Sequence, residues 1–213
     1  MNKKTLLKLS LLNLCLLSIL KTTSPTLASF ESYDKVNNEF GVGNIEASID
    51  ENGFREVKDW NGSKKDKIVN IENTGNVDCL VRVAITPRWK DNEEYVLLDT
   101  SKVELNFSQD MVGDINKVDL PTTKWLDGND GYYYYMSVVK PNDSTVALLE
   151  SVNLKSDSDD SKYLEKTLSI DVKVEVVQAT EIGTFQFEDK WLNLSDNTRD
   201  ILREIVSKYN STK

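Results

Sequence analysis

The chain has 213 residues, with 26 Lys and Arg against 35 Asp and Glu, so its net charge is −9 at pH 7. An acidic surface repels nucleic acids and anionic membranes, so we expect neither as a partner. The chain contains no histidine, which excludes Ser-His-Asp and Cys-His nucleophile activation and the HExxH zinc site. We therefore predict a protein that is not an enzyme and that has no catalytic residue, cofactor or metal.

Residues 1–28 have the pattern of a secretory signal peptide. Three lysines form a positively charged start: Lys3, Lys4 and Lys8. The apolar run that follows, 9–20, is too short to span a bilayer comfortably. Small residues stand at Thr26 and Ala28, so we expect a signal peptidase to cut between Ala28 and Ser29. The alternative is an uncleaved membrane anchor.

Cleavage would produce a secreted protein of about 185 residues, enough for one domain with a sizeable core. Removing the four lysines of residues 1–28 leaves 22 basic and 35 acidic residues, a net charge of −13. One cysteine, Cys79, would remain, so no internal disulfide can form. We expect an extracellular matrix or cell-surface protein without stable membrane insertion after cleavage.

Alternation of apolar and polar residues predicts strands in the body of the chain. The clearest alternation is at 168–176, and another lies at 77–85, where Cys79 is on the apolar face and is expected to pack as a small hydrophobe. Residues 132–139 are apolar on both faces, so we expect them to lie centrally or under a loop. Further candidate strands are 42–49, 67–71, 95–98, 103–107 and 145–154. This pattern predicts an antiparallel β-sandwich of jelly-roll type.

An amphipathic helix is predicted near the end of the chain. Ser195 or Asp196 can cap its start. Apolar residues at helical spacing form one stripe: Ile201, Leu202, Ile205, Val206 and Tyr209. We expect this helix to dock on the sandwich, and packing on a neighbouring subunit is the alternative. The predicted organisation is a signal peptide at 1–28, an extended segment at 29–43, a sandwich at 44–194 with a loop insertion near 109–130, and a helix and tail at 195–213.

Two motifs match known sites but lack the necessary context. Residues 32–35 fit S-x-x-K and residues 195–197 fit S-D-N, two marks of penicillin-recognising enzymes, but no K-T-G follows. The acidic run at 157–160 lacks the Gly and Glu that an EF-hand requires, because Lys162 and Leu168 occupy those positions. We interpret this run as a solvated loop, with a weak Ca²⁺ site as the alternative.

Four segments together resemble the TasA/camelysin-like family of bacterial matrix proteins, which are exported with a SipW-type signal peptidase. Near the start these are 36–43 (VNNEFGVG) and 68–83 (IVNIENTGNVDCLVRV). The later segments, 131–145 and 168–179, are similar to the branch described as alternate signal-mediated exported proteins. Their order and spacing are more specific than any single motif. Cys79 stands where the family commonly carries a small residue.

The resemblance implies a jelly-roll subunit that assembles into the extracellular fibres of a biofilm matrix. It also implies polymerisation by donation of the amino-terminal segment to the sheet of the next subunit, with copies of the chain, the signal peptidase and accessory matrix proteins as partners. An extended segment added to an open edge gains main-chain hydrogen bonds and fills apolar pockets. The candidate pocket fillers are Phe30, Tyr33, Val36 and Phe40. The alternative is that they fold back onto their own sandwich.

Three other readings remain open. The fibre could be cross-linked by Lys–Asn isopeptide bonds, for which the sequence identifies no residues. The protein could be a monomeric surface-binding module that stacks sugars on its tryptophans: Trp60, Trp89, Trp125 and Trp191. Camelysin-type members have also been described as metalloproteases, but carboxylates alone suit Ca²⁺ or Mg²⁺ better than hydrolytic Zn²⁺.

Overall fold

The computed structural model describes residues 44–53, 57–58, 62–109, 111–112, 124–155, 161–163, 165–180 and 186–213. The chain divides into two compact units, Met1–Glu31 and Ser32–Lys213, and every described residue belongs to the second. The predicted signal peptide, the candidate donor segment at 29–43 and the acidic run at 157–160 lie outside the described residues.

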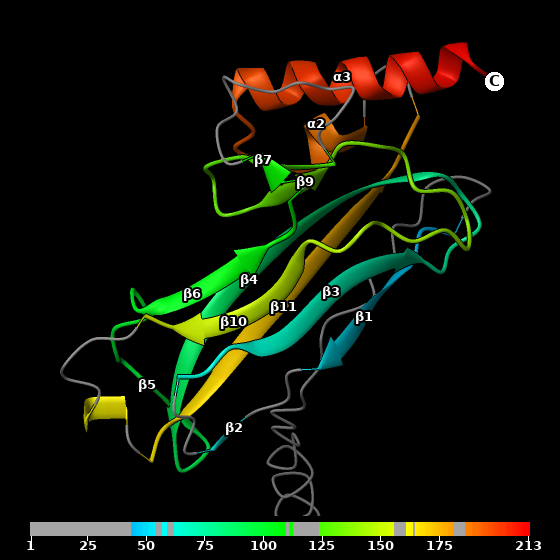
Figure 1. The fold of residues 1–213 in the computed structure, drawn as a ribbon. Coiled ribbons are helices and arrows are strands. Elements are labelled where there is room, and N and C mark those ends of the chain that lie inside the picture. Colours follow the sequence, from blue (N-terminus) through cyan, green and yellow to red (C-terminus); the bar gives the residue numbers. More distant parts are fainter. Residues whose placement is uncertain are drawn as a thin grey trace, which may run out of the picture. The chain divides into compact units, whose positions relative to one another are not determined.

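The described residues form two β-sheets that pack face to face, with helices on one outer side (Figure 1). The first sheet has the order β1 (Ala47–Gly53), β3 (Lys65–Asn73), β10 (Leu149–Leu154), β6 (Val103–Phe107). The second has the order β2 (Val57–Lys58), β11 (Thr167–Gln178), β4 (Cys79–Asp91), β9 (Tyr133–Tyr135), β8 (Trp125–Asp127), β7 (Met111–Val112), with β5 (Glu94–Val96) also paired to β4.

Neighbouring strands are antiparallel except β7 and β8, which are parallel. The helical elements are the 3-10 turn η2 (Ser161–Tyr163), α2 (Gln186–Lys190) and α3 (Asp196–Ser211). The prediction of a mainly antiparallel β protein with a C-terminal helix is therefore confirmed, and the jelly-roll connectivity stays a prediction. The described part of the predicted loop insertion near 109–130 contains the short strands β7 and β8.

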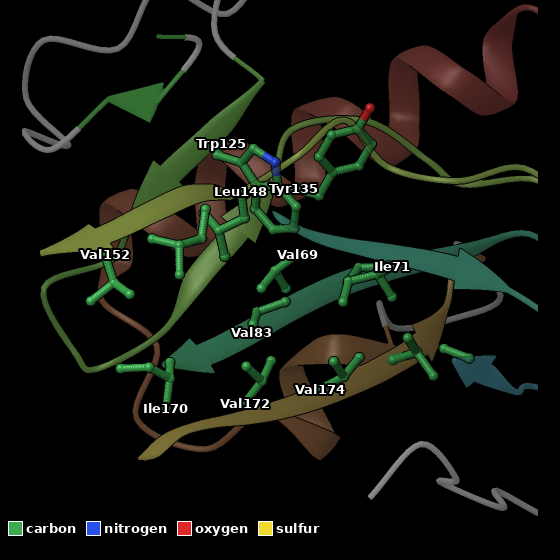
Figure 2. Packing of buried hydrophobic residues seen from close by; sticks show 14 of the residues in the cluster. Val69, Ile71, Val83, Trp125, Tyr135, Leu148, Val152, Ile170, Val172 and Val174 are labelled. Atoms are coloured by element: carbon green, nitrogen blue, oxygen red, sulfur yellow. The ribbon is translucent and has the colours of Figure 1, made fainter. Parts of the chain in front are cut away.

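The main hydrophobic core lies between the two sheets, as the alternating sequence predicts. Val81 and Val83 of β4 and Val172 and Val174 of β11 point into it. They meet Val69 and its neighbours on β3 (Figure 2). Each aliphatic side chain removed from water contributes roughly 1.5–3 kcal/mol to the free energy of unfolding. This core holds the two sheets together and fixes which face of each strand is inside.

The described tryptophans belong to the interior. The Nε1 group of Trp89 donates to the Asp99 carbonyl at 3.2 Å, and that of Trp125 donates to the Val146 carbonyl at 3.1 Å. Both indoles are almost completely buried, as is Trp191. Buried indoles of this kind are structural, so these three are not surface platforms for sugars. Trp60 lies outside the described residues.

A second hydrophobic cluster lies on the outer face of the second sheet, under α2 and α3. Helix α3 begins after Ser195, whose hydroxyl accepts from the Thr198 N–H at 3.1 Å. Leu202 and Val206 of the predicted stripe are buried against Leu80 and its neighbours on the sheet. The prediction that the helix docks on the sandwich is thus confirmed, whereas α2 was not predicted.

Asn73, the last residue of β3, holds the turn that follows this strand. Its Nδ2 group donates to the carbonyls of Val77 at 2.8 Å and Val139 at 2.9 Å, and its Oδ1 accepts from the Gly75 N–H at 3.0 Å. A Cβ atom at Gly75 would lie 2.4 Å from the Asn44 carbonyl oxygen, so only glycine fits this close approach. The residues just before β1 are therefore held against the turn that follows β3.

Candidate functional site

The longest uncovered sheet edge in the described part of the chain is the outer side of β11. Along one of its two edges, β11 pairs with β4 over its whole length, from Thr167 opposite Lys90 to Gln178 opposite Cys79. Along its other edge, which is the outer edge of the sheet, the described residues supply one partner, β2, which pairs only with Thr167 and Leu168. Residues 169–178 therefore present an edge that no described strand covers.

The antiparallel ladder decides which residues offer hydrogen-bonding groups at this edge. Just beyond β11, the Ala179 N–H donates to the Asp78 carbonyl at 2.9 Å, on the β4 side. In an antiparallel strand, the main-chain N–H and C=O groups of successive residues point alternately to the two neighbouring strands. The odd-numbered residues of β11 therefore direct these groups toward β4. The even-numbered residues turn an N–H and a C=O outward: Ile170, Val172, Val174 and Val176.

The same even-numbered residues point their side chains into the seam between the two sheets. Figure 2 shows Ile170, Val172 and Val174 following one another along β11 on the core side. β1, an edge strand of the first sheet, approaches β11 across this seam. Leu168, beside β2, is 0% exposed, whereas Ile170 and Val172 are 8% and 9% exposed. The uncovered edge thus adjoins apolar side chains that retain some contact with solvent.

The other long strand of this sheet protects its own unpaired stretch. β4 pairs with β9 at Arg82 and Val83 and with β5 from Trp89 onward, and no described strand pairs with 84–88 on that side. Pro87 lies in this gap, at a position whose main-chain groups face away from β11. Proline without an N–H is a common way to prevent strand addition at an edge. Residues 169–178 contain neither proline nor glycine.

A buried polar cluster lies beside this edge on the outer face of the sheet. Arg82 is 5% exposed, and its Nε and Nη2 groups donate to the same Glu175 carboxylate oxygen at 2.9 and 2.5 Å. Its guanidinium lies 4.0 Å from the ring centre of Tyr132 and 4.9 Å from that of Trp191. The Tyr132 hydroxyl donates to the other Glu175 oxygen at 2.8 Å. These contacts tie the sheet to the connection between α2 and α3.

Glu175 is held in its charged form by this cluster. Burial raises the pKa of Glu175, but hydrogen bonds from Lys173, Arg82 and Tyr132 outweigh burial and leave that pKa below its ordinary value of 4.5. The Lys173 ammonium lies 2.7 Å from the carboxylate and raises the local positive charge. A carboxylate so fully paired is a structural anchor, because both of its oxygens already accept hydrogen bonds and it carries no proton to donate.

The remaining candidates for reactive or metal-binding groups have structural roles. Burial, followed by the charge of Asp78, raises the pKa of Cys79 to about 12, so the thiol stays protonated at neutral pH. Ser195 of the S-D-N motif caps α3. Among the residues that the structure describes, no group of three or more His, Cys, Asp or Glu side chains could hold a metal ion. No helix in the same part of the chain has the length and apolar character needed to cross a membrane.

The donor residues predicted from the sequence cannot be placed beside this edge directly. Four side chains were singled out, and all lie outside the described residues: Phe30, Tyr33, Val36 and Phe40. The same holds for the cleavage positions Ala28 and Ser29. The described chain begins at Asn44, whose N–H donates to the Asn76 side chain at 2.6 Å and whose carbonyl accepts from the Asn76 N–H at 2.9 Å.

Comparison with known proteins adds no family assignment: no family model, curated protein or solved structure matches the chain. The edge of β11 was also not identified from the sequence. Alternation at 168–176 predicted the strand, but the pattern does not distinguish an edge strand from a central one. The available signal was the lack of proline, glycine or an inward-facing charge over 169–178.

Proposed function

We propose that the protein is a secreted structural subunit that polymerises into extracellular fibres of a biofilm matrix. In this proposal each subunit donates its amino-terminal segment, 29–43, to the sheet of the next. The observation that carries the proposal is the uncovered edge of β11 at 169–178, because an edge whose main-chain groups have no partner strand is a template for another strand. The resemblance to the TasA/camelysin-like family supports the same function.

Donation of a segment from one copy to the next is a head-to-tail contact. Such a contact uses two different surfaces of the same chain, and it produces an open filament when the rotation between copies does not close a ring. Signal-peptide cleavage would release the segment only after export, so polymerisation would be restricted to the outside of the cell. Copies of the chain are then the main partners, joined by a SipW-type signal peptidase and accessory matrix proteins.

The first experiment compares two purified proteins, 29–213 and 44–213, by electron microscopy and size-exclusion chromatography. We expect fibres from 29–213 and monomers from 44–213, because only the longer protein has a segment to donate. A matched control keeps the length of 29–213 but replaces Phe30, Val36 and Phe40 with serine, and it should remain monomeric. Monomers from all three proteins, or fibres from 44–213, would contradict the proposed function.

A further inference from the structure

We infer that the acceptor is the outer edge of β11 in a second copy, and that residues 36–42 form the inserted strand. This inference rests on the proposed function and specifies its partner surface. The inserted strand would pair antiparallel with 170–176 and stop where β2 already occupies Leu168. Its even-numbered side chains would enter the seam between β11 and β1.

The pattern of 36–42 matches this edge at three of its four inward-facing positions. In an extended strand alternate residues share a face, so the apolar side chains of Val36, Phe40 and Val42 lie on one side, together with the uncharged amide of Asn38. The other side carries Asn37, Glu39 and Gly41, which suits the polar outer face of the sheet.

The same alternation narrows the donor from 29–43 to its last part. Phe30 also has even parity, but two polar residues of that parity, Ser32 and Asp34, separate it from Val36. A strand that placed Phe30 in the seam would also have to bury the Asp34 carboxylate there, which is costly without a partner. The strand that enters the seam therefore begins at Val36.

Residues 36–42 in extended form span about 23 Å and would therefore cover the 170–176 part of the uncovered edge. In the antiparallel register that ends at β2, Val42 lies opposite Ile170 and Phe40 lies opposite Val172. Val172 is the most exposed of the four even-numbered residues, at 9%. The largest inserted side chain would thus cover the part of the seam that is least closed.

Strand orientation favours a second copy over the chain's own edge. Asn44 contacts Asn76, and Ala179 contacts Asp78, so the described chain begins close to the end of β11. A segment that ends at Asn44 would therefore run parallel to its own β11. A segment from a second copy has no such tether and can run antiparallel, as both β2 and β4 do. Antiparallel pairing is slightly more stable per residue than parallel pairing.

Engineered disulfides can distinguish these two arrangements. Both test proteins carry Asp171→Cys, on the outer face of β11, within the 29–213 chain. In the antiparallel register Gly41 lies opposite Asp171, at a non-hydrogen-bonded pair whose short Cα separation permits a disulfide. In a parallel register that sets Asn44 level with Gln178, at the end of β11, Asn37 takes that place. The two proteins are therefore Gly41→Cys with Asp171→Cys, and Asn37→Cys with Asp171→Cys.

We expect mild oxidation of the Gly41→Cys protein to give a ladder of covalent multimers on a non-reducing gel, collapsed by reducing agent. The Asn37→Cys protein should give at least fivefold fewer multimers. An internal disulfide in monomeric Asn37→Cys protein would overturn the inference, because it would place the segment on its own β11. Unlinked fibres from both proteins would also overturn it, since the acceptor would then lie elsewhere. Absence of fibres from unmodified 29–213 would instead contradict the proposed function itself.

A pair of substitutions at Val174 tests the acceptor independently. The Val174 N–H faces the uncovered side, so Val174→Pro removes a donor from the edge without removing a β4 hydrogen bond. Val174→Ala shortens the side chain but keeps that donor. If both variants unfold cooperatively, we expect Val174→Pro to form at least tenfold less sedimentable fibre than unmodified 29–213. Val174→Ala should form most of the unmodified amount. Equal fibre yields from the two folded variants would overturn the assignment, and the disulfide result decides the matter if Val174→Pro does not fold.

Discussion

Arg82 is a buried charge whose contacts offset the cost of removing a guanidinium from water, which reaches several kcal/mol. Glu175 neutralises it with two hydrogen bonds, and the rings of Tyr132 and Trp191 lie within cation–π distance. Because Arg82 and Glu175 lie directly opposite each other on β4 and β11, this pair depends on the register of the ladder. It therefore resists slippage of the strand that carries the proposed acceptor edge.

The Glu175 carboxylate should make folding stability depend on pH. Its pKa is lower in the folded protein than its ordinary value of 4.5, so its contribution is present above that value and is lost as pH falls through the lower, folded pKa. We expect Glu175→Gln to reduce the free energy of unfolding at pH 7, and the difference from the unmodified protein to shrink as the pH falls below about 4.5 and through the lowered folded pKa. Urea unfolding followed by tryptophan fluorescence at each pH measures this difference.

Glu150→Gln is the matched control, because Glu150 is an exposed carboxylate on the other sheet. This variant should remain close to the unmodified protein throughout the pH range. A constant difference between the unmodified protein and Glu175→Gln from pH 7 to pH 3 would show that the carboxylate is not selectively stabilised by its partners.

At the scale of elements, the sequence predicts structure wherever burial of one face makes apolar residues recur at a fixed spacing. The alternation at 77–85 and 168–176 predicts much of β4 and β11, and the helical stripe predicts α3. Helix α2 is too short, at five residues, to show a stripe. The turn between β4 and β5 contains no glycine that would mark it in the sequence. Asn92 and Glu93 adopt the positive φ angles there, 48° and 71°.

The candidate site depends on pairings that no single strand encodes. Alternation places Arg82 and Glu175 on polar faces, but only the register between two strands sets them opposite each other. Likewise, whether β11 is an edge depends on the strands that pair with it, and among the described residues β2 pairs only with Thr167 and Leu168. The composition of the proposed donor segment at 36–42 can be read from the sequence, whereas the proposed acceptor edge depends on how the strands pair in the sheet.

The N-cap of α3 should determine how firmly this helix covers the second cluster. We expect Ser195→Ala to lower the free energy of unfolding by about 1 kcal/mol, because the Thr198 N–H loses its acceptor. Ser195→Asn retains a capping oxygen and should lie within about 0.5 kcal/mol of the unmodified protein. Urea unfolding of the three proteins at pH 7 measures both differences. Equal losses in the two variants would mean that packing, and not the cap, is responsible.

At the scale of the whole molecule, the buried apolar side chains of the described residues form two clusters. The core between the sheets is closed by β4, β11 and β3, and the outer cluster is closed by α2 and α3. Beside β11, at 169–178, the described residues leave main-chain groups unpaired next to core side chains that are at most 9% exposed. Helix α3 occupies part of the outer face of the second sheet (Figure 1), so the proposed strand addition would use the edge beside it.

A head-to-tail fibre of this kind should be sensitive to a subunit that accepts but cannot donate. Protein 44–213 keeps the β11 edge and lacks the segment, so it can bind a free donor at a fibre end and then offers none in return. We expect fibres of 29–213 grown with one tenth as much 44–213 to be several-fold shorter in electron micrographs. The control is 44–213 with Val174→Pro, which neither donates nor accepts and should leave fibre length unchanged. Equal shortening by both truncated proteins would point to nonspecific interference, and no shortening by either would mean that growth does not proceed by donation to the β11 edge.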